Sequence, residues 1–526
     1  MTFPRWIRAW TILTLLLISL PYMAGWLFTP EGKTFTGNLQ NFEDANAYHA
    51  YMNRGAAGDI FHIIPYNPVK TKPIPIFPLY ILPGHLHRIL GLSIPLIFHL
   101  MRLSYGGIFI LTSYSFVRRI LPDEPEQKLA MFILLFTAGL GWISIILIGG
   151  DEGGYHPNLV PDMWRMEATG FGSLISSPHF TLSIALMIGL LLLARQSIRE
   201  GDRKSGIASA LLGALLAATH PHHLATVGVV LAIIYGWQGH QVQWRALIRL
   251  GVIMLPAVLI SLWLVWAIRQ DEILTYWSTH TANPTPMPTW GIYLTFGLTL
   301  ILALLGTAYV IKTDHEYMRM AVLWFVGLLV VLHLPSESRW RFVEGWHVPM
   351  AILAAVGWYR GVLPRLGLWV SPRLSTAGLA LFLSMSTIFI FCILLVRITW
   401  KTDGDVFMDE ADIAAAEWLD DHAPANSVVL ASYDTGNRLP ARAAVQVYAG
   451  HWAVTFHRAQ RVAMINQFLS TMSDAERIDL LRENSIDYLY YGMEEQPLGT
   501  FSPEQAEYLE PVYSNAEVTI YTVSLP

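Results

Sequence analysis

Residues 41–51 read Asn-Phe-Glu-Asp-Ala-Asn-Ala-Tyr-His-Ala-Tyr and follow an apolar run that ends near Phe28. Charged groups close to a bilayer are costly, and they are commonly kept for function. In a helix, Asp44, Tyr48 and Tyr51 would lie at i, i+4 and i+7, on one face. An acid backed by two aromatic rings is suited to bind a sugar hydroxyl, so these residues are candidate substrate-lining groups.

A structural interpretation of the same stretch is available. Asn41 is a favourable residue to cap a helix, and Glu43 and Asp44 would then occupy the first turn, where the helix dipole stabilises anions. Asp59, which follows Gly58 in the same loop, is assigned only to a turn.

The composition places the chain in a membrane. Of its 526 residues 53% are hydrophobic and 14% are charged, whereas globular domains carry about 25% charged residues. The single cysteine, Cys392, lies inside an apolar run, so an internal disulfide is excluded. The first apolar run is long and lacks a convincing cleavage site, so we expect a retained membrane helix rather than a signal peptide.

The charge is divided between two regions. Residues 402–526 hold 6 Lys and Arg against 20 Asp and Glu, and residues 1–401 hold 28 against 19. This division predicts a basic transmembrane domain, 1–401, and a soluble acidic domain, 402–526. Neither region has the dense basic clusters that bind nucleic acid.

Apolar runs of spanning length predict about eleven transmembrane helices. The predicted spans are 7–28, 96–117, 129–149, 179–195, 206–219, 222–237, 250–268, 290–312, 320–335, 346–363 and 375–399. Lys and Arg gather in alternate connectors, which predicts a cytoplasmic amino terminus and an acidic domain outside. This alternation requires 206–237 to cross twice, although one long kinked helix is the alternative.

The loop and the tail have their own patterns. The first outer loop, 29–95, carries a proline-rich apolar segment at 73–92 that predicts a helix lying on the membrane surface. In the tail, helices are predicted at 413–422, 461–472 and 474–483, and strands at 427–432, 488–491 and 518–523. Alternating helices and strands indicate a small α/β domain.

Two acids in the loop after the third span are candidate metal ligands. Asp151 and Glu152 lie between glycine pairs, in a turn that could offer oxygen ligands to Mg²⁺ or Mn²⁺. An ordinary solvated turn has the same composition.

Further outer-loop groups could bind a donor phosphate. His179 opens a predicted span, either to donate to phosphate or as an interfacial histidine. Between spans nine and ten, Arg339 and Arg341 precede His347, and in a helix Arg341, Glu344 and His347 would share a broad face. Glu344 is here a candidate to line the substrate site. Arginine suits a phosphate leaving group, although arginines at a membrane surface also reach lipid headgroups.

The run His220-Pro221-His222-His223 suggests a metal site at first sight. Because no carboxylate or cysteine is nearby in the sequence, a proline break between two helices is the favoured interpretation.

Taken together, these features resemble the GT-C membrane glycosyltransferases, which include protein O-mannosyltransferases, the aminoarabinose transferase of lipid A and the catalytic subunit of oligosaccharyltransferase. The resemblance covers residues 1–400 in layout and is sharpest at 41–60 and 339–349. It implies a polyprenyl-phosphate-linked sugar donor, an acid at Glu43-Asp44 that acts as base or metal ligand, and a second acidic motif at Asp151 and Glu152. The chain has Glu-Asp where several members have Asp-Glu, and it lacks the Trp-Trp-Asp motif of oligosaccharyltransferases.

The sequence therefore predicts a multi-pass enzyme of a prokaryotic plasma membrane that transfers a sugar, with inversion, to an extracytoplasmic acceptor. Asp44 would act as the base, and the acceptor is a glycan, lipid or protein that the sequence does not name. A transporter or flippase of lipid-linked sugars is one alternative, and a non-catalytic membrane scaffold is another. Val447 to Trp452 resembles a segment of prokaryotic membrane proteins with this layout, without an assigned role.

Overall fold

The computed structural model describes residues 2–76, 78–143, 161–238, 241–280, 290–334, 337–366, 371–400 and 404–526. The predicted metal ligands Asp151 and Glu152 lie outside these residues. Contacts divide the chain into two compact units. The first contains Met1–Leu20, Leu100–Trp263 and Asn283–Leu394, and the second contains Pro21–His99, Leu264–Ala282 and Leu395–Pro526.

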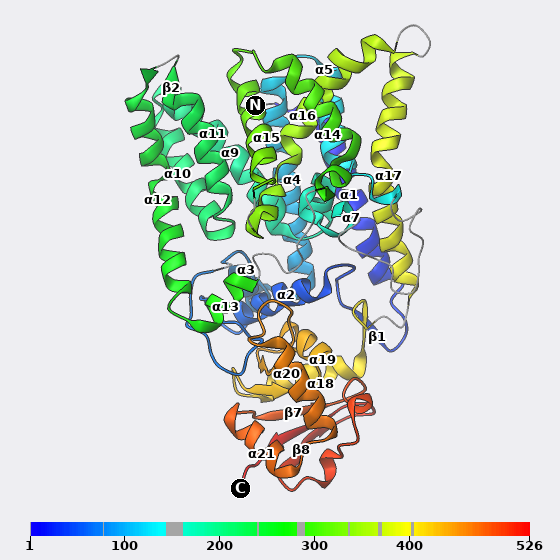
Figure 1. Cartoon of the computed structure of the whole chain (residues 1–526). Coiled ribbons are helices and arrows are strands. Elements are labelled where there is room, and N and C mark those ends of the chain that lie inside the picture. Colours follow the sequence, from blue (N-terminus) through cyan, green and yellow to red (C-terminus); the bar gives the residue numbers. More distant parts are fainter. Residues whose placement is uncertain are drawn as a thin grey trace. The chain divides into compact units, whose positions relative to one another are not determined.

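The first unit is a bundle of helices (Figure 1). Four helices continue from one unit into the other: α1 (Arg5–Leu27), α4 (Ile94–Ile120), α12 (Trp244–Ile268) and α17 (Pro372–Thr399). The longer helices inside the bundle are α5 (Glu124–Phe136), α9 (Pro178–Glu200), α10 (Arg203–Thr219), α11 (His223–Gly236), α14 (Gly291–Val310), α15 (Glu316–Val331) and α16 (His347–Val356), and α16 continues as a π-helical turn, η3 (Gly357–Val362). Short elements connect them: α7 (Pro161–Trp164), η1 (Met166–Ala168), α8 (Gly170–Ile175), η2 (Glu337–Val343), η4 (Leu363–Arg365) and the hairpin β2 (Trp237–Gln238) and β3 (Gln241–Val242).

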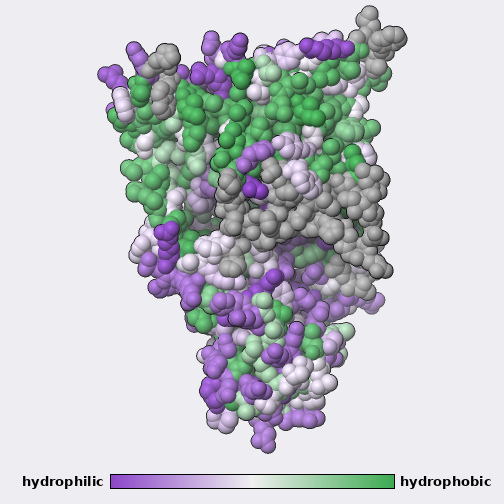
Figure 2. All heavy atoms as spheres, in the orientation of Figure 1, coloured by the Kyte–Doolittle hydropathy of each residue, from purple (hydrophilic) through white to green (hydrophobic). Residues whose placement is uncertain are grey.

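Within the described residues, six helices are long and apolar enough to cross a membrane. They are α1, α4, α9, α12, α14 and α17, and each coincides with a predicted span. Helices α10, α11, α15 and α16 also fall on predicted spans but are shorter. The predicted span 129–149 is not one continuous helix, because α5 ends at Phe136 and Thr137 is extended; residues 144–149 lie outside the described residues. A membrane protein is thus supported, and the count of eleven spans stays a prediction. Figure 2 shows apolar residues over much of the visible surface of these helices.

The chain reverses direction at residues 220–222. The start of α9 and the end of α10 meet, because the rings of His179 and His220 are 5.0 Å apart. At the far end of α9, the guanidinium of Arg199 lies 5.1 Å from the ring of Tyr235, near the end of α11. Helix α11 therefore runs alongside α9 in the same direction, and α10 runs against both. This arrangement supports two separate helices, as predicted, rather than one kinked helix (Figure 1).

Close backbone contact holds α14 against α16. A Cβ atom on Gly306 would lie 1.9 Å from the carbonyl oxygen of Leu353, and one on Gly357 would lie 2.0 Å from that of Leu302. Small residues allow this approach, which strengthens van der Waals packing between helices in lipid.

The second unit combines the first predicted outer loop with the carboxy-terminal tail. Its loop helices are α2 (Phe42–Ala56) and α3 (Pro78–Leu90), and α13 (Glu272–His280) belongs to the same unit. Strand β1 (Lys33–Phe35) pairs antiparallel with β4 (Phe407–Asp409), which joins the loop to the tail. The predicted segment 73–92 contains α3, which begins at Pro78, consistent with a short loop helix.

The tail forms a five-stranded mixed sheet in the order β6-β5-β7-β9-β8. Its strands are β5 (Val428–Leu430), β6 (Gln446–Val447), β7 (Tyr488–Tyr491), β8 (Leu509–Ser514) and β9 (Thr519–Val523). Its helices are α18 (Glu410–His422), α19 (Tyr433–Arg438), α20 (Arg458–Ser470) and α21 (Asp474–Glu483). Phe468 and Leu481 from the helices pack with Leu489 of β7 in one buried apolar cluster. Every helix and strand predicted for the tail is present in the structure.

Candidate functional site

Glu43 and Asp44 lie in the first turn of α2, where the helix dipole favours anions. Asn41, the residue before the helix, has φ 51° and ψ 48°, and its side chain makes no capping hydrogen bond. Asparagine tolerates this left-handed conformation better than most residues. Its Nδ2 instead donates to Oδ2 of Asp44 at 2.9 Å. The cap predicted for Asn41 is therefore wrong, and its side chain holds the acid rather than the helix backbone.

Residues of the tail surround the Asp44 carboxylate. Oδ1 of Asp44 accepts a hydrogen bond from the indole Nε1 of Trp452 at 3.1 Å and lies 3.2 Å from Nε2 of His451. Nδ1 of His451 accepts the backbone N–H of Ala453 at 3.1 Å. An imidazole nitrogen that accepts carries no proton, so in neutral His451 the proton is on Nε2. His451 is thereby fixed as a donor to Asp44.

The same tail segment also holds Glu43. Oε2 of Glu43 accepts hydrogen bonds from the hydroxyl of Tyr433 at 2.9 Å and from the backbone N–H of Trp452 at 2.8 Å. Asn437 donates to the backbone carbonyl of Glu43 at 3.4 Å. Glu43 is thus held by α19 and by the turn at 451–452, and Asp44 is held by the same turn.

These contacts decide the charge state of Asp44. Burial raises the pKa of the Asp44 carboxyl, but the hydrogen bond and charge of His451, with the bonds from Asn41 and Trp452, outweigh it and leave the pKa below its ordinary value of 3.8. Asp44 is therefore ionised at neutral pH. Its side chain is about 25% exposed, so the carboxylate is held but still reachable from solvent.

The two predicted aromatic neighbours differ in position. Tyr48 is half-buried and stacks on Tyr80, with ring centroids 4.5 Å apart. Tyr51 is 4% exposed and packs edge-on against His62 at 4.3 Å. Tyr48 is available to line a site beside Asp44, whereas Tyr51 belongs to the core of this unit.

A second group of polar residues forms in the helical unit, around Glu344. Oε1 of Glu344 lies 3.3 Å from Nδ1 of His220 and 3.3 Å from Nε2 of His223, and it accepts a hydrogen bond from Ser183 of α9. Glu344 is 3% exposed and His223 is 1% exposed. The carboxylate that the sequence appeared to lack near 220–223 therefore comes from a residue more than 100 positions later.

The residues predicted to bind donor phosphate are distributed differently from the expected helix face. Residues 337–343 form a 3₁₀ helix, η2, and Gly345 has φ 77°, which only glycine adopts readily, so α16 begins afresh at His347. The single α-helical face predicted for Arg341, Glu344 and His347 is consequently wrong. Arg341 is exposed and Arg339 is half-buried.

The two histidines of this set are buried. Nδ1 of His347 accepts the backbone N–H of Gly170 at 3.1 Å, and the side chain is 2% exposed. His179 does open a helix, α9, as predicted, and its ring lies against that of His220. His347 thus orients a loop, and His179 adjoins the Glu344 group.

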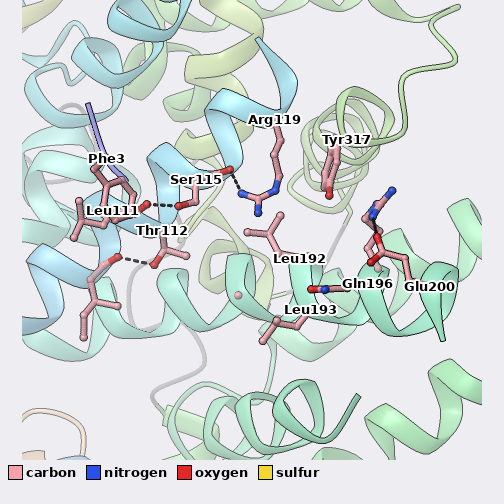
Figure 3. Close-up of a pocket in the computed structure, with 13 residues that line it drawn as sticks. Phe3, Leu111, Thr112, Ser115, Arg119, Leu192, Leu193, Gln196, Glu200 and Tyr317 are labelled. Carbon is pink, nitrogen blue, oxygen red and sulfur yellow. Dashed lines mark hydrogen bonds and ion pairs between the residues drawn. The ribbon is translucent and has the colours of Figure 1, made fainter. Parts of the chain in front are cut away.

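The helical unit also contains an open cavity of about 590 Å³. Figure 3 shows Leu111 and Ser115 of α4 and Leu192 and Gln196 of α9 lining it, and Arg119 extending from α4. The α9 residues that line it come from the second half of that helix, whereas His179 and Ser183 lie in the first. None of the residues of the Glu344 group lines this cavity. The cavity is therefore distinct from the Glu344 group.

Comparison with solved structures identifies the fold. The chain superposes on an arabinofuranosyltransferase, AftD, from Mycobacteria with a TM-score of 0.55 and 15% identity, covering all of this chain and 42% of that one. It matches ArnT from Cupriavidus metallidurans bound to undecaprenyl phosphate with a TM-score of 0.51 and 12% identity, covering 98% of both chains. It matches the Archaeoglobus fulgidus oligosaccharyltransferase tethered with an acceptor peptide with a TM-score of 0.50 and 12% identity, covering 98% of this chain and 74% of that one.

The chain has the GT-C fold. The predicted resemblance is confirmed at the level of fold, and these structural neighbours are glycosyltransferases. No family model matches the sequence. No curated protein sequence matches it either.

Sequence reasoning identified Glu43 and Asp44 but not their partners. His451 and Trp452 belong to a segment that had been singled out without a role, and Tyr433 and Asn437 had not been singled out at all. Nothing in local spacing connects them to Asp44, because the contacts span about 400 positions of the chain. The one signal in the sequence was the adjacent pair His451-Trp452 within residues 447–452.

Proposed function

We propose that this chain is an integral membrane glycosyltransferase. It transfers a sugar, with inversion, from a polyprenyl-phosphate donor to an acceptor on the extracytoplasmic face of a prokaryotic plasma membrane. The amino terminus is then cytoplasmic and the acidic tail extracytoplasmic. The GT-C fold supports this proposal, as do the six helices of spanning length and composition.

One observation carries the proposal: Asp44 is an ionised, partly exposed carboxylate held by donors from a distant part of the chain. A residue that served only to stabilise a helix terminus would not need three side-chain donors. Such fixed positioning is typical of groups that act in catalysis, because the geometry is established before the substrate arrives.

In the proposed reaction, Asp44 accepts a hydrogen bond from the acceptor hydroxyl. That oxygen forms a bond to the anomeric carbon while the bond from this carbon to the phosphate oxygen breaks. As the new bond forms, the hydroxyl becomes strongly acidic, and its proton passes to Asp44. The products are the inverted glycoside and the polyprenyl phosphate. The low pKa of Asp44 means that proton transfer follows, rather than precedes, much of the bond formation.

Other groups would stabilise the leaving phosphate. Arg341 and Arg339 are the candidates with exposed surface, and arginine matches phosphate geometry well. Asp151 and Glu152 remain proposed ligands for Mg²⁺ or Mn²⁺, which would neutralise phosphate charge. That these arginines and the two acids converge with Asp44 on one outer cavity remains a prediction.

The choice of donor is supported by one structural neighbour. The ArnT structure contains undecaprenyl phosphate, and it aligns over 98% of both chains. We therefore propose the same class of carrier lipid for this chain. The sugar and the acceptor are unassigned.

The test is transfer of a labelled sugar from a synthetic polyprenyl-phosphate sugar in membranes that contain the purified protein. Sugar transfer by the wild type that is lost when Asp44 is replaced supports the proposed glycosyltransferase. The transporter alternative predicts movement of the lipid-linked sugar across the bilayer without a new glycosidic bond, and the scaffold alternative predicts neither. Lipid movement without transfer would replace this proposal.

A further inference from the structure

A carboxylate that is distant in the sequence lies against the turn between α10 and α11. His220 directly follows α10, and His223 begins α11, so the reversal of the chain brings both imidazoles to the same side. Glu344 approaches them from the loop between η2 and α16. One ligand atom from each of these three residues lies within 4.8 Å of the other two.

The nitrogens that face Glu344 lack hydrogen bonds of good geometry. Nδ1 of His220 and Nε2 of His223 are buried without a hydrogen-bond partner among the described residues, although each lies 3.3 Å from Oε1 of Glu344. A buried polar atom without a partner is costly, so such atoms call for an explanation. Two nitrogens and one oxygen that converge at ion-pair distance, rather than through well-formed hydrogen bonds, are arranged as ligands of a shared cation.

We propose that His220, His223 and Glu344 bind one divalent transition-metal ion of the Zn²⁺ class. Tetrahedral Zn²⁺ with bonds near 2.1 Å requires ligand atoms roughly 3.4 Å apart, and the two nitrogen–oxygen distances of 3.3 Å meet this requirement. Two imidazoles favour Zn²⁺ over Mg²⁺ or Ca²⁺, which prefer oxygen ligands. Ser183, which donates to Glu344, would orient the carboxylate from outside the coordination sphere.

The chemistry of the site also excludes the main alternative ligand. Several histidines near a membrane surface suggest an anion such as phosphate, but the buried Glu344 carboxylate would repel it. A cation site with two histidines and one glutamate leaves a fourth position for water or another ligand. The site shares no residue with the group around Asp44, so this inference does not depend on the proposed base.

Metal content tests the site directly. The full-length protein is purified in detergent, incubated with ZnCl₂, and freed of loosely bound metal on a desalting column. We expect about one Zn²⁺ per chain by elemental analysis, and less than a fifth of that for His220→Ala/His223→Ala and for Glu344→Gln. His222→Ala is the matched control, because His222 lies in the same turn but is not among the three residues. It should retain the metal.

A second measurement distinguishes lost ligands from lost folding. Added Zn²⁺ should raise the melting temperature of the wild type and of His222→Ala, because a ligand that binds only the native state stabilises it. Glu344→Gln should melt as a folded protein but show no Zn²⁺-dependent shift. Substoichiometric metal in the wild type, or equal content in wild type and Glu344→Gln, would overturn the site.

Discussion

The indole Nε1 of Trp452 lies 3.1 Å from Oδ1 of Asp44, although 408 positions separate the two residues. This bond ties the acid of the first predicted outer loop to the tail within one compact unit. The tail is thus part of the surroundings of Asp44 rather than an appendage to the membrane domain.

The first prediction concerns the charge on Asp44. Asp44→Asn should lower sugar transfer by about 10²- to 10⁴-fold, the usual effect of losing a general base. Asparagine keeps the shape of the side chain and an oxygen that can accept from Trp452, so the melting temperature should change little. Transfer is measured from a labelled polyprenyl-phosphate sugar.

The control for Asp44→Asn must be an acid that can be replaced without disturbing the fold. Asp59, assigned to a simple turn from sequence, is ion-paired with Arg54, whose side chain is only 5% exposed. Removing Asp59 would leave a buried charge without its partner, so it is unsuitable. Asp421 is exposed on α18, and Asp421→Asn should transfer sugar at the wild-type rate. Equal rates for Asp44→Asn and wild type would exclude Asp44 as the base.

The second prediction concerns His451, which we propose as a positioning residue. In the wild type, protonation of Asp44 should lower the rate of sugar transfer only below pH 3.8, because the pKa of Asp44 lies below this ordinary value. In His451→Ala the largest lowering contribution is gone, so burial raises the pKa of Asp44 and the rate falls at a higher pH. His451→Gln retains a donor and should restore most of the original profile. If the transfer rate falls at the same low pH in all three proteins, His451 does not lower the pKa of Asp44.

A third prediction uses two buried histidines outside the predicted spans. Burial lowers the pKa of His49 and of His62 to about 3, from 6.5. The unfolded chain therefore binds these protons first as the pH falls, and stability is lost progressively from pH 6.5 downward. Each residue should cost about 2 kcal/mol at pH 5, from 1.36 kcal/mol per pKa unit.

His49→Phe removes one titrating group and keeps an aromatic ring beside Phe98. Melting temperatures from pH 7 to 5 should fall less steeply in this variant than in wild type. Parallel curves would mean that the pKa of His49 is the same in the folded and the unfolded chain.

Much of this fold is predictable because local pattern determines it. Apolar runs predict the positions of α1, α4 and α17, and the tyrosine-rich run at residues 488–491 predicts β7. The turn at 220–222 followed from Pro221. Local pattern was misleading where backbone conformation depends on a single residue. Gly345, with its positive φ, lies in the turn between η2 and α16 and separates Glu344 from His347.

The site was only half predictable. Asp44 was found because two acids beside an apolar run are unusual. The groups that give it a low pKa, and the Glu344 that completes the histidine group, come from distant segments. Tertiary contacts of this kind leave no periodic signal, so one sequence without its structure could not reveal them.

A fourth prediction tests membrane orientation. In a protein without Cys392, Glu410→Cys places one thiol on the exposed first turn of α18. An extracytoplasmic tail predicts labelling of intact cells by a membrane-impermeant maleimide. Cysteine in place of Arg203, in a connector predicted to be cytoplasmic, is the matched control and should react only after the membrane is opened. The reverse pattern would put Asp44 on the cytoplasmic face and exclude the proposed topology.

The last prediction tests how α2 is held. A Cβ atom on Gly55 of α2 would lie 1.9 Å from the carbonyl oxygen of Ile81, and one on Gly84 of α3 would lie 1.9 Å from that of Met52. Gly55→Ala should therefore force the helices apart and destabilise the protein by about 1–3 kcal/mol, the usual cost of overpacking. Gly251 of α12 is the control, since a Cβ there meets no atom within 4 Å. Gly251→Ala should not lower the melting temperature, because alanine favours a helix interior over glycine. Because α2 carries Asp44, Gly55→Ala should also reduce transfer in the fraction that remains folded. A Gly55→Ala protein with wild-type stability and activity would show that α2 and α3 are not in this close contact.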